Sequence, residues 1–281
     1  MCRLFGMSAG EQPARATFWL LDAPDSLAAQ SHREPDGTGL GWFDGEGAPH
    51  VSKQPIAAYG DLEFARESRE VCSRTFVAHV RFASTGALDL RNTHPFQQDG
   101  RLFAHNGVIQ GLAALDAHLG DARRLVEGDT DSERFFALIT REIAARDGDI
   151  GGGIEAACTW VAQNVPLLAI NFVLATDDAL WALRYPNTHP LYLLERQPGA
   201  PLEHSSKLGS RVHSPEGTDR AFTVIASECM DADRGWELLA SGELIEIGHT
   251  LEVRRRVILE HPPAQPLTLS DLDTEARASQ S

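Results

Sequence analysis

The chain has 281 residues, a length that accommodates one large domain or two small ones. Hydrophobic residues make up 42% and charged residues 23%, as in ordinary globular proteins, so the chain can bury a core without disulfide or metal support. The formal net charge is −15, from 40 acidic and 25 basic residues, which argues against nucleic acid or an anionic membrane as a partner, because phosphate contacts need a basic face.

The first 120 residues predict short strands interleaved with helices. Residues 3–8, 75–82 and 102–105 have the apolar pattern of strands, and the glycine-rich segment 37–43 suits a loop that feeds a strand. Residues 16–32 carry apolar side chains at helical spacing and are divided in two by Pro24. A further helix is expected at 112–119.

Two longer helices are expected in the middle of the chain. The segment 129–133 has the features of a helix start, since Thr130 or Asp131 can cap and acidic residues suit a first turn. That helix continues to residue 143, and the glycines of 148–153 predict a break before a second helix at 154–163. Strand-like runs follow at 167–176, 180–185, 191–194, 221–227, 244–247 and 251–259. This order predicts an α+β fold in which helices cover antiparallel sheets.

The domain organisation is expected to be simple. No repeat, charge run or linker divides residues 1–260, which therefore read as one domain. Residues 261–281 are polar and rich in proline, which predicts a tail that is either disordered or laid on the surface.

The four cysteines are expected to be unpaired thiols in a reducing cytoplasm, because none lies in a CxxC spacing; they are Cys2, Cys72, Cys158 and Cys229. The N-terminal residues lack the basic and apolar regions of a signal peptide, and the apolar run 165–175 is too short to cross a bilayer. No membrane partner is therefore expected. His79, His94 and His105 fit no zinc spacing, so no metal is expected either.

Cys2 directly follows the initiator methionine. If Met1 is removed, Cys2 carries both a thiol, with a reference pKa of about 8.5, and a free α-amine, with a reference pKa of about 7.7–8.0. The amine can take the proton of the thiol, directly or through one water, as the sulfur attacks. A nucleophile that carries its own base is the logic of the N-terminal-nucleophile hydrolases.

Three other segments offer complementary groups. The side-chain amide of Asn106 and the backbone N–H of Gly107 can donate to an oxyanion, although Asn-Gly is also a standard pair for a type I′ turn. Arg81, at the end of a strand, can bind a carboxylate with both arms of its guanidinium. Asp131 can receive an ammonium group, or it can simply cap a helix. Arg81 and Asp131 together suit the head group of a free amino acid.

In their order and spacing these segments resemble the class II glutamine amidotransferases, most closely the small stand-alone, YafJ-type branch. The matching segments are Met1-Cys2 with the following Leu4, Gly6, Met7 and Ser8, the stretch HREPDGTG at 32–39, His79-Val80-Arg81, NTHPF at 92–96, His105-Asn106-Gly107, DTDSE at 129–133, and VIASE at 224–228 with Trp236. The resemblance covers about residues 1–258. Glu34 stands where members often have glycine, and Phe82 stands where some members have tryptophan.

The resemblance implies a four-layer αββα sandwich of the N-terminal-nucleophile type. It implies Cys2 as the nucleophile, Asn106 and Gly107 as the oxyanion hole, and Arg81 and Asp131 as partners of the glutamine α-carboxylate and α-amino group. Further candidates for contacts at the site are Arg33, His79, Ser84, Ser227 and Glu228. No cofactor is expected, and the sequence has no GxxxxGK[ST] phosphate loop.

The implied reaction is hydrolysis of glutamine to glutamate and ammonia through a γ-glutamyl thioester. A chain of this length is expected to hold no synthase domain, so an ammonia acceptor must be bound by a partner, or the enzyme simply hydrolyses its substrate. Three alternatives stay open: a γ-glutamyl amide hydrolase of the ergothioneine-pathway type, a non-catalytic subunit that retains the fold, and a hydrolase of another amide, such as a penicillin or a bile-salt amide.

Overall fold

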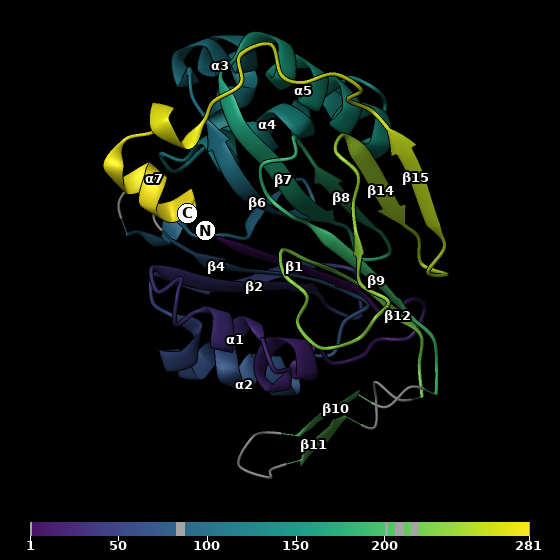
Figure 1. Ribbon diagram of the computed structural model, residues 1–281. Coiled ribbons are helices and arrows are strands. Elements are labelled where there is room, and N and C mark those ends of the chain that lie inside the picture. The colour runs from purple at the N-terminus through teal and green to yellow at the C-terminus, as the bar shows by residue number, and fades with distance from the viewer. Residues whose placement is uncertain (1, 83–87, 200–201, 206–210, 215–218, 281) are drawn as a thin grey trace.

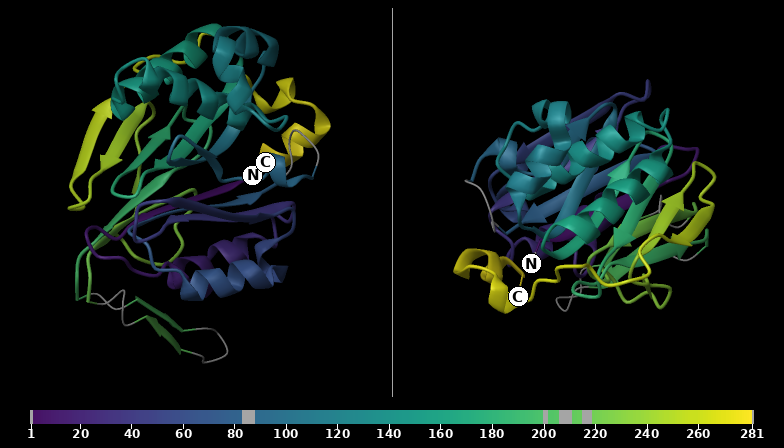
Figure 2. Two further views of the ribbon diagram at one scale, coloured as in Figure 1. Left: turned by 180° about the vertical axis from the view of Figure 1, so that it is seen from behind. Right: turned by 90° about the horizontal axis from the view of Figure 1, so that it is seen from above.

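A computed structural model describes residues 2–82, 88–199, 202–205, 211–214 and 219–280 of the chain. Two antiparallel sheets lie face to face, and helices cover the outer face of each sheet (Figures 1 and 2). The layers therefore follow in the order helix, sheet, sheet, helix, which confirms the predicted αββα sandwich.

The first sheet has the N-terminal strand near its centre. In spatial order its described strands are β13 (Glu237–Leu238), β9 (Tyr192–Arg196), β12 (Phe222–Ala226), β1 (Arg3–Ser8), β4 (Thr75–Arg81), β2 (Gly37–Phe43) and β3 (Pro49–Gln54). Strands β1 and β4 are antiparallel, with Arg3 opposite Val80 and Ser8 opposite Thr75. The start of β1 therefore lies beside the end of β4.

The second sheet lies over the first with its strands aligned. In spatial order its described strands are β15 (Val253–Val257), β14 (Glu243–Ile247), β8 (Leu180–Arg184), β7 (Leu167–Ala175), β6 (Arg101–Ile109) and β5 (Phe96–Gln98). Across the interface β1 contacts β6, β7 and β8, whereas β4 contacts β6 and β7 and β3 contacts β5. A separate pair, β10 (Leu202–Ser205) with β11 (Arg211–Ser214), projects from the sandwich (Figure 1).

The helices fall into two groups, one on each outer face. The first sheet is covered by η1 (Phe18–Asp22), α1 (Leu27–Gln30), η2 (Ala58–Gly60) and α2 (Leu62–Glu70), and the second by α3 (Leu112–Leu119), η4 (Gly120–Leu125), α4 (Asp131–Ala144) and α5 (Ile150–Asn164). The remaining turns and helix are η3 (Leu90–Asn92), η5 (Leu269–Asp271) and α7 (Thr274–Gln280). The predicted cap of α4 is confirmed, because the Thr130 side chain accepts from the backbone N–H of Glu133 at 3.3 Å.

Three apolar layers hold the sandwich together. Alternation along β1 directs Phe5 and Met7 towards the helices of the first sheet and Leu4 towards the second sheet. The third layer, which includes Phe103 and Phe136, lies between the second sheet and its helices. Because both of its faces are covered, β1 is buried along its whole length.

The break predicted at 148–153 is present between α4 and α5 but ends earlier than expected, because α5 begins at Ile150. The side chain of Asp149 caps this helix by accepting from the backbone N–H of Gly152 at 3.0 Å. A Cβ added to Gly153 would lie 2.4 Å from Cγ1 of Ile143 in α4. Glycine at this point therefore permits two helices to touch closely and does not end a helix.

Other elements differ from the prediction in length or were not predicted. β2 occupies the whole of the segment expected to begin as a loop, and β6 continues through Asn106 and Gly107 to Ile109. The type I′ turn considered for Asn106-Gly107 is therefore absent, since both residues lie inside a strand. The sequence does not predict α2, which buries only Phe64 and Ser68 and so has little apolar pattern.

The segment that follows His261 returns along the second sheet towards the start of the chain. It ends in α7, and the end of α7 lies beside the start of β1 in each of the three views (Figures 1 and 2). This segment therefore borders the same end of the sandwich as Cys2.

Candidate active site

Cys2 lies just before β1, at the end of the sandwich where β4 finishes. Its Sγ atom is 3.4 Å from both the backbone nitrogen and the carbonyl oxygen of Phe82, and the residue is 8% exposed. Burial raises the pKa of the Cys2 thiol, while the backbone contact with Phe82 and the charge of Arg81 act in the opposite direction. The resting thiol is therefore protonated near neutral pH, and it needs a base when it reacts.

Arg81 is the last residue of β4 and lies beside Gly37 of β2. The backbone N–H of Asp36 donates to the carbonyl of Arg81 at 3.0 Å, which fixes the loop before β2 against this strand end. Burial lowers the pKa of the Arg81 guanidinium, and the nearby Cys2, Asp36 and Asp131 raise it. Arg81 is 4% exposed, so a cation is held in a desolvated place close to both Cys2 and Asp131.

Asn106 and Gly107 face the same end of the sandwich from the second sheet. Asn106 is 1% exposed and lies opposite Asn171 of β7. Among the described residues, neither the amide nitrogen nor the amide oxygen of Asn106 has a hydrogen-bond partner. Such a group is costly to bury unless a ligand satisfies it, so it can serve as a donor to a bound molecule.

Gly107 is required by close approach of the backbone. A Cβ at this position would lie 1.9 Å from the carbonyl oxygen of Ala169 in the neighbouring strand. The pairing of β6 with β7 then shifts register, since Val108 lies opposite Ala169 and Ile109 opposite Leu167, with Leu168 as the extra residue.

The bulge after Gly107 also positions Asp131. The backbone N–H of Ile109 donates to Oδ2 of Asp131 at 2.8 Å, and the Ser132 hydroxyl donates to Oδ1 at 3.4 Å. Asp131 is the first residue of α4 and is 5% exposed, but the cap of that helix is Thr130. The alternative interpretation of Asp131 as a helix cap is therefore wrong, and its carboxylate is turned towards β6.

His79, His94 and His105 form a buried group behind the site. The ring centroids of His79 and His94 are 4.2 Å apart, and Nδ1 of His105 is 2.9 Å from the Ser132 hydroxyl. Burial lowers the pKa of His79 to about 3 and lowers the pKa values of His94 and His105. The three rings are therefore neutral at physiological pH, which suits packing between the sheets.

A network of ion pairs surrounds Arg3, the residue that follows Cys2. Arg3 is 3.4 Å from Glu34 and 2.5 Å from Glu228, and Arg33 is 3.1 Å from Glu228 and 3.4 Å from Asp25. Burial and a hydrogen bond with Glu228 raise the pKa of Asp25 to about 6. Arg33 and Glu228, both predicted as site candidates, are thus paired with each other at the rim of the site.

Glu34 is a buried carboxylate, at the position where the family named in the sequence analysis often has glycine. It is 2% exposed, and its charge acts on Cys2 in the direction that raises the thiol pKa. Burial raises the pKa of Glu34 itself, against the charges of Arg3 and Arg33.

Ser227 has a structural contact beside the nucleophile. Its hydroxyl accepts from the backbone N–H of Leu4 at 3.0 Å, and its own N–H donates to the Leu4 carbonyl at 3.1 Å. These bonds extend the pairing of β12 with β1 by one residue. Ser84, the remaining candidate, lies outside the described residues.

Lys53 was not predicted and holds the segment that follows β4. Its Nζ donates to the carbonyl of Thr93 at 2.8 Å and lies 5.2 Å from the centroid of the Phe96 ring. Burial lowers the pKa of Lys53, against the charges of three acidic residues nearby. The only available signal is compositional, because the chain has just one other lysine, Lys207.

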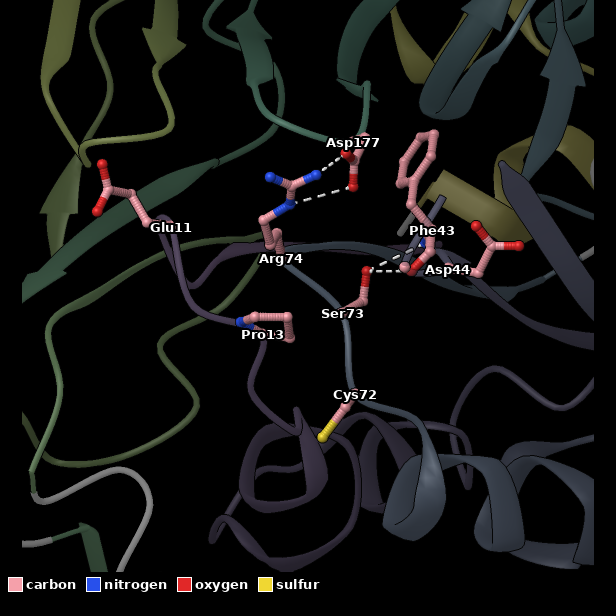
Figure 3. Close-up of a pocket in the computed structure, with 9 residues that line it drawn as sticks. Glu11, Pro13, Phe43, Asp44, Cys72, Ser73, Arg74 and Asp177 are labelled. Atoms are coloured by element: carbon pink, nitrogen blue, oxygen red, sulfur yellow. Dashed lines mark hydrogen bonds and ion pairs between the residues drawn. The ribbon is translucent and has the colours of Figure 1, made fainter. Parts of the chain in front are cut away.

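A cavity of about 310 Å³ lies at the far end of β1 and β4 (Figure 3). Cys72, Ser73 and Arg74 line it, together with Asp177, which forms an ion pair with Arg74. The six residue steps from Cys2 to Ser8 place it roughly 20 Å from Cys2, at ~3.3 Å a residue. This cavity is therefore separate from the cysteine site.

The described residues contain neither a candidate metal site nor a candidate membrane span. No group of three or more histidine, cysteine, aspartate or glutamate side chains within them could hold a metal ion. Likewise, no helix in the part of the chain that the structure describes is long and apolar enough to cross a membrane.

The chain is similar to known proteins over nearly its whole length. The family described as glutamine amidotransferases class-II matches residues 1–270. The YafJ protein of Escherichia coli is 26% identical over 86% of this chain and 96% of its own length. The γ-glutamyl-hercynylcysteine sulfoxide hydrolase of Mycobacterium tuberculosis is 29% identical over 88% of this chain and 93% of its own.

Solved structures show the same fold. Glutamine phosphoribosylpyrophosphate amidotransferase from Bacillus subtilis superposes with a TM-score of 0.63 at 20% identity, over 93% of this chain. The present chain spans 50% of that protein. A class-II domain protein from Silicibacter pomeroyi superposes with a TM-score of 0.60 at 19% identity, over 92% of this chain and 100% of its own.

Proposed function

The chain belongs to the class II glutamine amidotransferases, and we propose that it hydrolyses the side-chain amide of glutamine to glutamate and ammonia through a thioester on Cys2. The observation that carries this proposal is the meeting of Cys2 with Arg81 and Asp131 at one end of the sandwich, where Asn106 has an unpartnered amide among the described residues. An amino-acid head group and a carboxamide carbonyl need these charges and this donor.

The first step is attack by sulfur. After Met1 is removed, the α-amine of Cys2 takes the thiol proton while Sγ bonds to the amide carbon, because the buried thiol is not ionised at rest. The α-ammonium group of Cys2 then passes this proton to the amide nitrogen of the tetrahedral intermediate, the C–N bond breaks, and ammonia leaves. The product on the enzyme is a γ-glutamyl thioester.

The second step is hydrolysis of the thioester. The α-amine, again free, removes a proton from water as the water oxygen attacks the thioester carbon. Collapse of this second intermediate breaks the C–S bond and returns the proton to sulfur, which releases glutamate and restores Cys2.

Asn106 and Gly107 are proposed to stabilise the oxyanion in both steps. The Asn106 amide is pre-positioned inside a strand and has no partner among the described residues to give up, so it can bind the developing charge without reorganisation. Loss of one donor of this kind reduces kcat by about 10²–10³-fold in comparable sites.

Arg81 and Asp131 are proposed to hold the α-carboxylate and the α-ammonium group. Both charges are desolvated, which strengthens their attraction for a zwitterionic head group. A non-catalytic subunit that retains the fold would not need this pair. A hydrolase of an amide without an amino-acid head group would not need it either.

The Cys2→Ala variant tests the proposal directly. We expect it to lose glutaminase activity while its melting temperature stays close to that of the unmodified protein, and we expect the matched variant Cys72→Ala to keep full activity. Turnover in Cys2→Ala equal to that of the unmodified protein would overturn the assignment of the nucleophile.

A γ-glutamyl conjugate is the second candidate substrate. It is favoured by the similarity over nearly full length to γ-glutamyl-hercynylcysteine sulfoxide hydrolases, which are 26% and 29% identical to this chain. Arg81 and Asp131 would hold the same γ-glutamyl end. A preference for a conjugate over glutamine by more than tenfold in kcat/KM would replace the glutaminase assignment with this one.

We also propose a reducing, cytoplasmic setting and a partner that accepts ammonia. All four cysteines are free, and a nucleophilic thiol must stay reduced to act. Co-purification from cells, followed by a test for glutamine-dependent amination, would identify the acceptor. Release of all ammonia to solvent in the presence of the co-purified protein would contradict a coupled acceptor.

A further inference from the structure

The C-terminal segment is attached to the strand that supports Asn106 and Gly107. Pro266 forms a parallel bridge with Leu167, whose N–H donates to the carbonyl of Gln265 at 3.2 Å. The N–H of Leu267 donates back to Leu167 at 2.9 Å. Leu167 is the residue at which β7 resumes its pairing after the bulge, so the segment meets the second sheet right beside the Gly107–Ile109 backbone.

Apolar packing then fixes α7 at this place. Leu272 and Ala276 are 3% and 4% exposed and pack with Val108 and Leu168. Val108 directly follows Gly107, and Leu168 is the extra residue of the bulge. Helix α7 is therefore positioned by contacts with the residues that shape the proposed oxyanion hole.

The last described residue, Gln280, makes a buried contact with His189. His189 Nε2 is 2.8 Å from Oε1 of Gln280, and the two residues are 2% and 3% exposed. The carbonyl of His189 accepts from Nδ2 of Asn171 at 3.2 Å and from Nε of Arg184 at 2.8 Å. Since Asn171 lies opposite Asn106, Gln280 is linked to the site through a short series of contacts.

The tautomer of His189 follows from this contact. The amide oxygen of Gln280 only accepts, so Nε2 carries the proton and Nδ1 is a bare acceptor. No described residue donates to this Nδ1, although it is buried. Burial lowers the pKa of His189 to about 4, and the charge of Arg3 lowers it too, so the ring is neutral and lies within the field of the residue that follows Cys2.

Strand order decides which side of the substrate this contact faces. β1 lies between β4 and β12, and Arg81 is on the β4 side. The second sheet runs in the same sense, since β1 contacts β6, β7 and β8, whereas β4 contacts β6 and β7 and β3 contacts β5. The β8–β9 connection that carries His189 therefore lies on the side of β1 away from Arg81. We therefore expect a substrate whose head group is held by Arg81 and whose carbonyl lies at Cys2 to direct its leaving nitrogen towards His189.

We propose that α7, through the contact of Gln280 with His189, forms the wall of the site on the side of the leaving nitrogen and so restricts the substrate to an unsubstituted carboxamide. This inference rests on the proposed function. Both polar residues of this contact are buried, and helix α7 lies beside the start of β1 (Figures 1 and 2). A bulky group on the γ-nitrogen would collide with it.

Substrate size tests the wall. Glutamine and γ-glutamyl-p-nitroanilide are compared in the full chain, in Gln280→Ala and in the control Gln265→Ala, which loses only the contact of its side chain with the Asn164 carbonyl. We expect Gln280→Ala to raise the kcat/KM ratio of anilide to glutamine at least tenfold, and Gln265→Ala to leave it unchanged. An unchanged ratio in Gln280→Ala, with an unchanged melting temperature, overturns the proposal.

A second measurement does not depend on hydrolysis. Alkylation of Cys2 by iodoacetamide and by the bulkier pyrene maleimide is followed by peptide mass spectrometry, with the exposed Cys72 as an internal reference. We expect Gln280→Ala to accelerate the bulky reagent at Cys2 by at least fivefold relative to iodoacetamide; equal acceleration of both would overturn the wall. If the full chain hydrolyses neither amide, the proposed function fails while this comparison still decides on the wall.

Discussion

Asp131→Asn separates substrate binding from support of the fold. Asparagine keeps a side-chain oxygen that can accept from the backbone N–H of Ile109, as Oδ2 of Asp131 does at 2.8 Å. It removes the charge that would bind the α-ammonium group, and a hydrogen bond to a charged group contributes about 1.5–3 kcal/mol. At about 1.4 kcal/mol for each factor of ten, we expect KM for glutamine to rise roughly 10- to 150-fold with kcat changed far less.

Two variants serve as controls for this prediction. Asp131→Ala leaves the buried N–H of Ile109 without an acceptor, which costs about 1–3 kcal/mol and lowers the melting temperature by roughly 2–12 °C. Thr130→Ala removes the cap of α4 at about 0.5–2 kcal/mol of stability and should change KM by less than about threefold. An unchanged KM in Asp131→Asn, measured by glutamate release, would refute the binding role.

Three further predictions concern packing and pH. Gly107→Ala should abolish hydrolysis and lower stability by about 1–3 kcal/mol or more in urea denaturation, because its Cβ would lie 1.9 Å from the Ala169 carbonyl; a fully active variant would contradict this. The pKa of His79 is lowered by burial to about 3, so below about pH 6.5 the unfolded chain binds a proton that the folded protein does not. The free energy of unfolding should therefore fall from pH 7 to 5, and it should fall less in His79→Gln. An equal fall in both proteins would mean that the ring is protonated when folded. The pKa of Asp25 is raised by burial to about 6, so the folded protein keeps this proton up to a higher pH than the unfolded chain does. The melting temperature should therefore fall from about pH 4 to 6, and Asp25→Asn should lack this fall. Equal pH profiles of the two proteins would contradict the raised pKa.

Much of the fold could be predicted because local pattern and tertiary structure agree. The alternating side chains of β1 and the cap and apolar stripe of α4 are local signals, and the structure uses both. The predicted start of α5 is too late, because glycine is a poor helix former in isolation; in the structure Asp149 caps this helix and Gly153 lies against Ile143. Helix α7 similarly depends on the burial of Leu272 and Ala276 by distant strands.

The candidate site divides in the same way. Cys2, Arg81, Asn106 and Asp131 lie in short motifs whose residue types already indicate their chemistry, and the fold brings their segments to one end. The contacts around them lack such motifs: His189 and Gln280 are 91 residues apart in the sequence. Contacts between single polar residues that are distant in the sequence arise only from packing, so no rule of sequence spacing could predict them.

The central claim is that Cys2 attacks the substrate with its own α-amine as base. The most direct test uses a diazoketone analogue of glutamine, which alkylates the thiol that would attack the amide. The mass of the labelled N-terminal peptide is then measured by mass spectrometry. We predict a single adduct on a peptide that begins at Cys2 and lacks Met1, with complete loss of glutaminase activity. An adduct on Cys72 or Cys229, or full activity of protein that retains Met1, would contradict it.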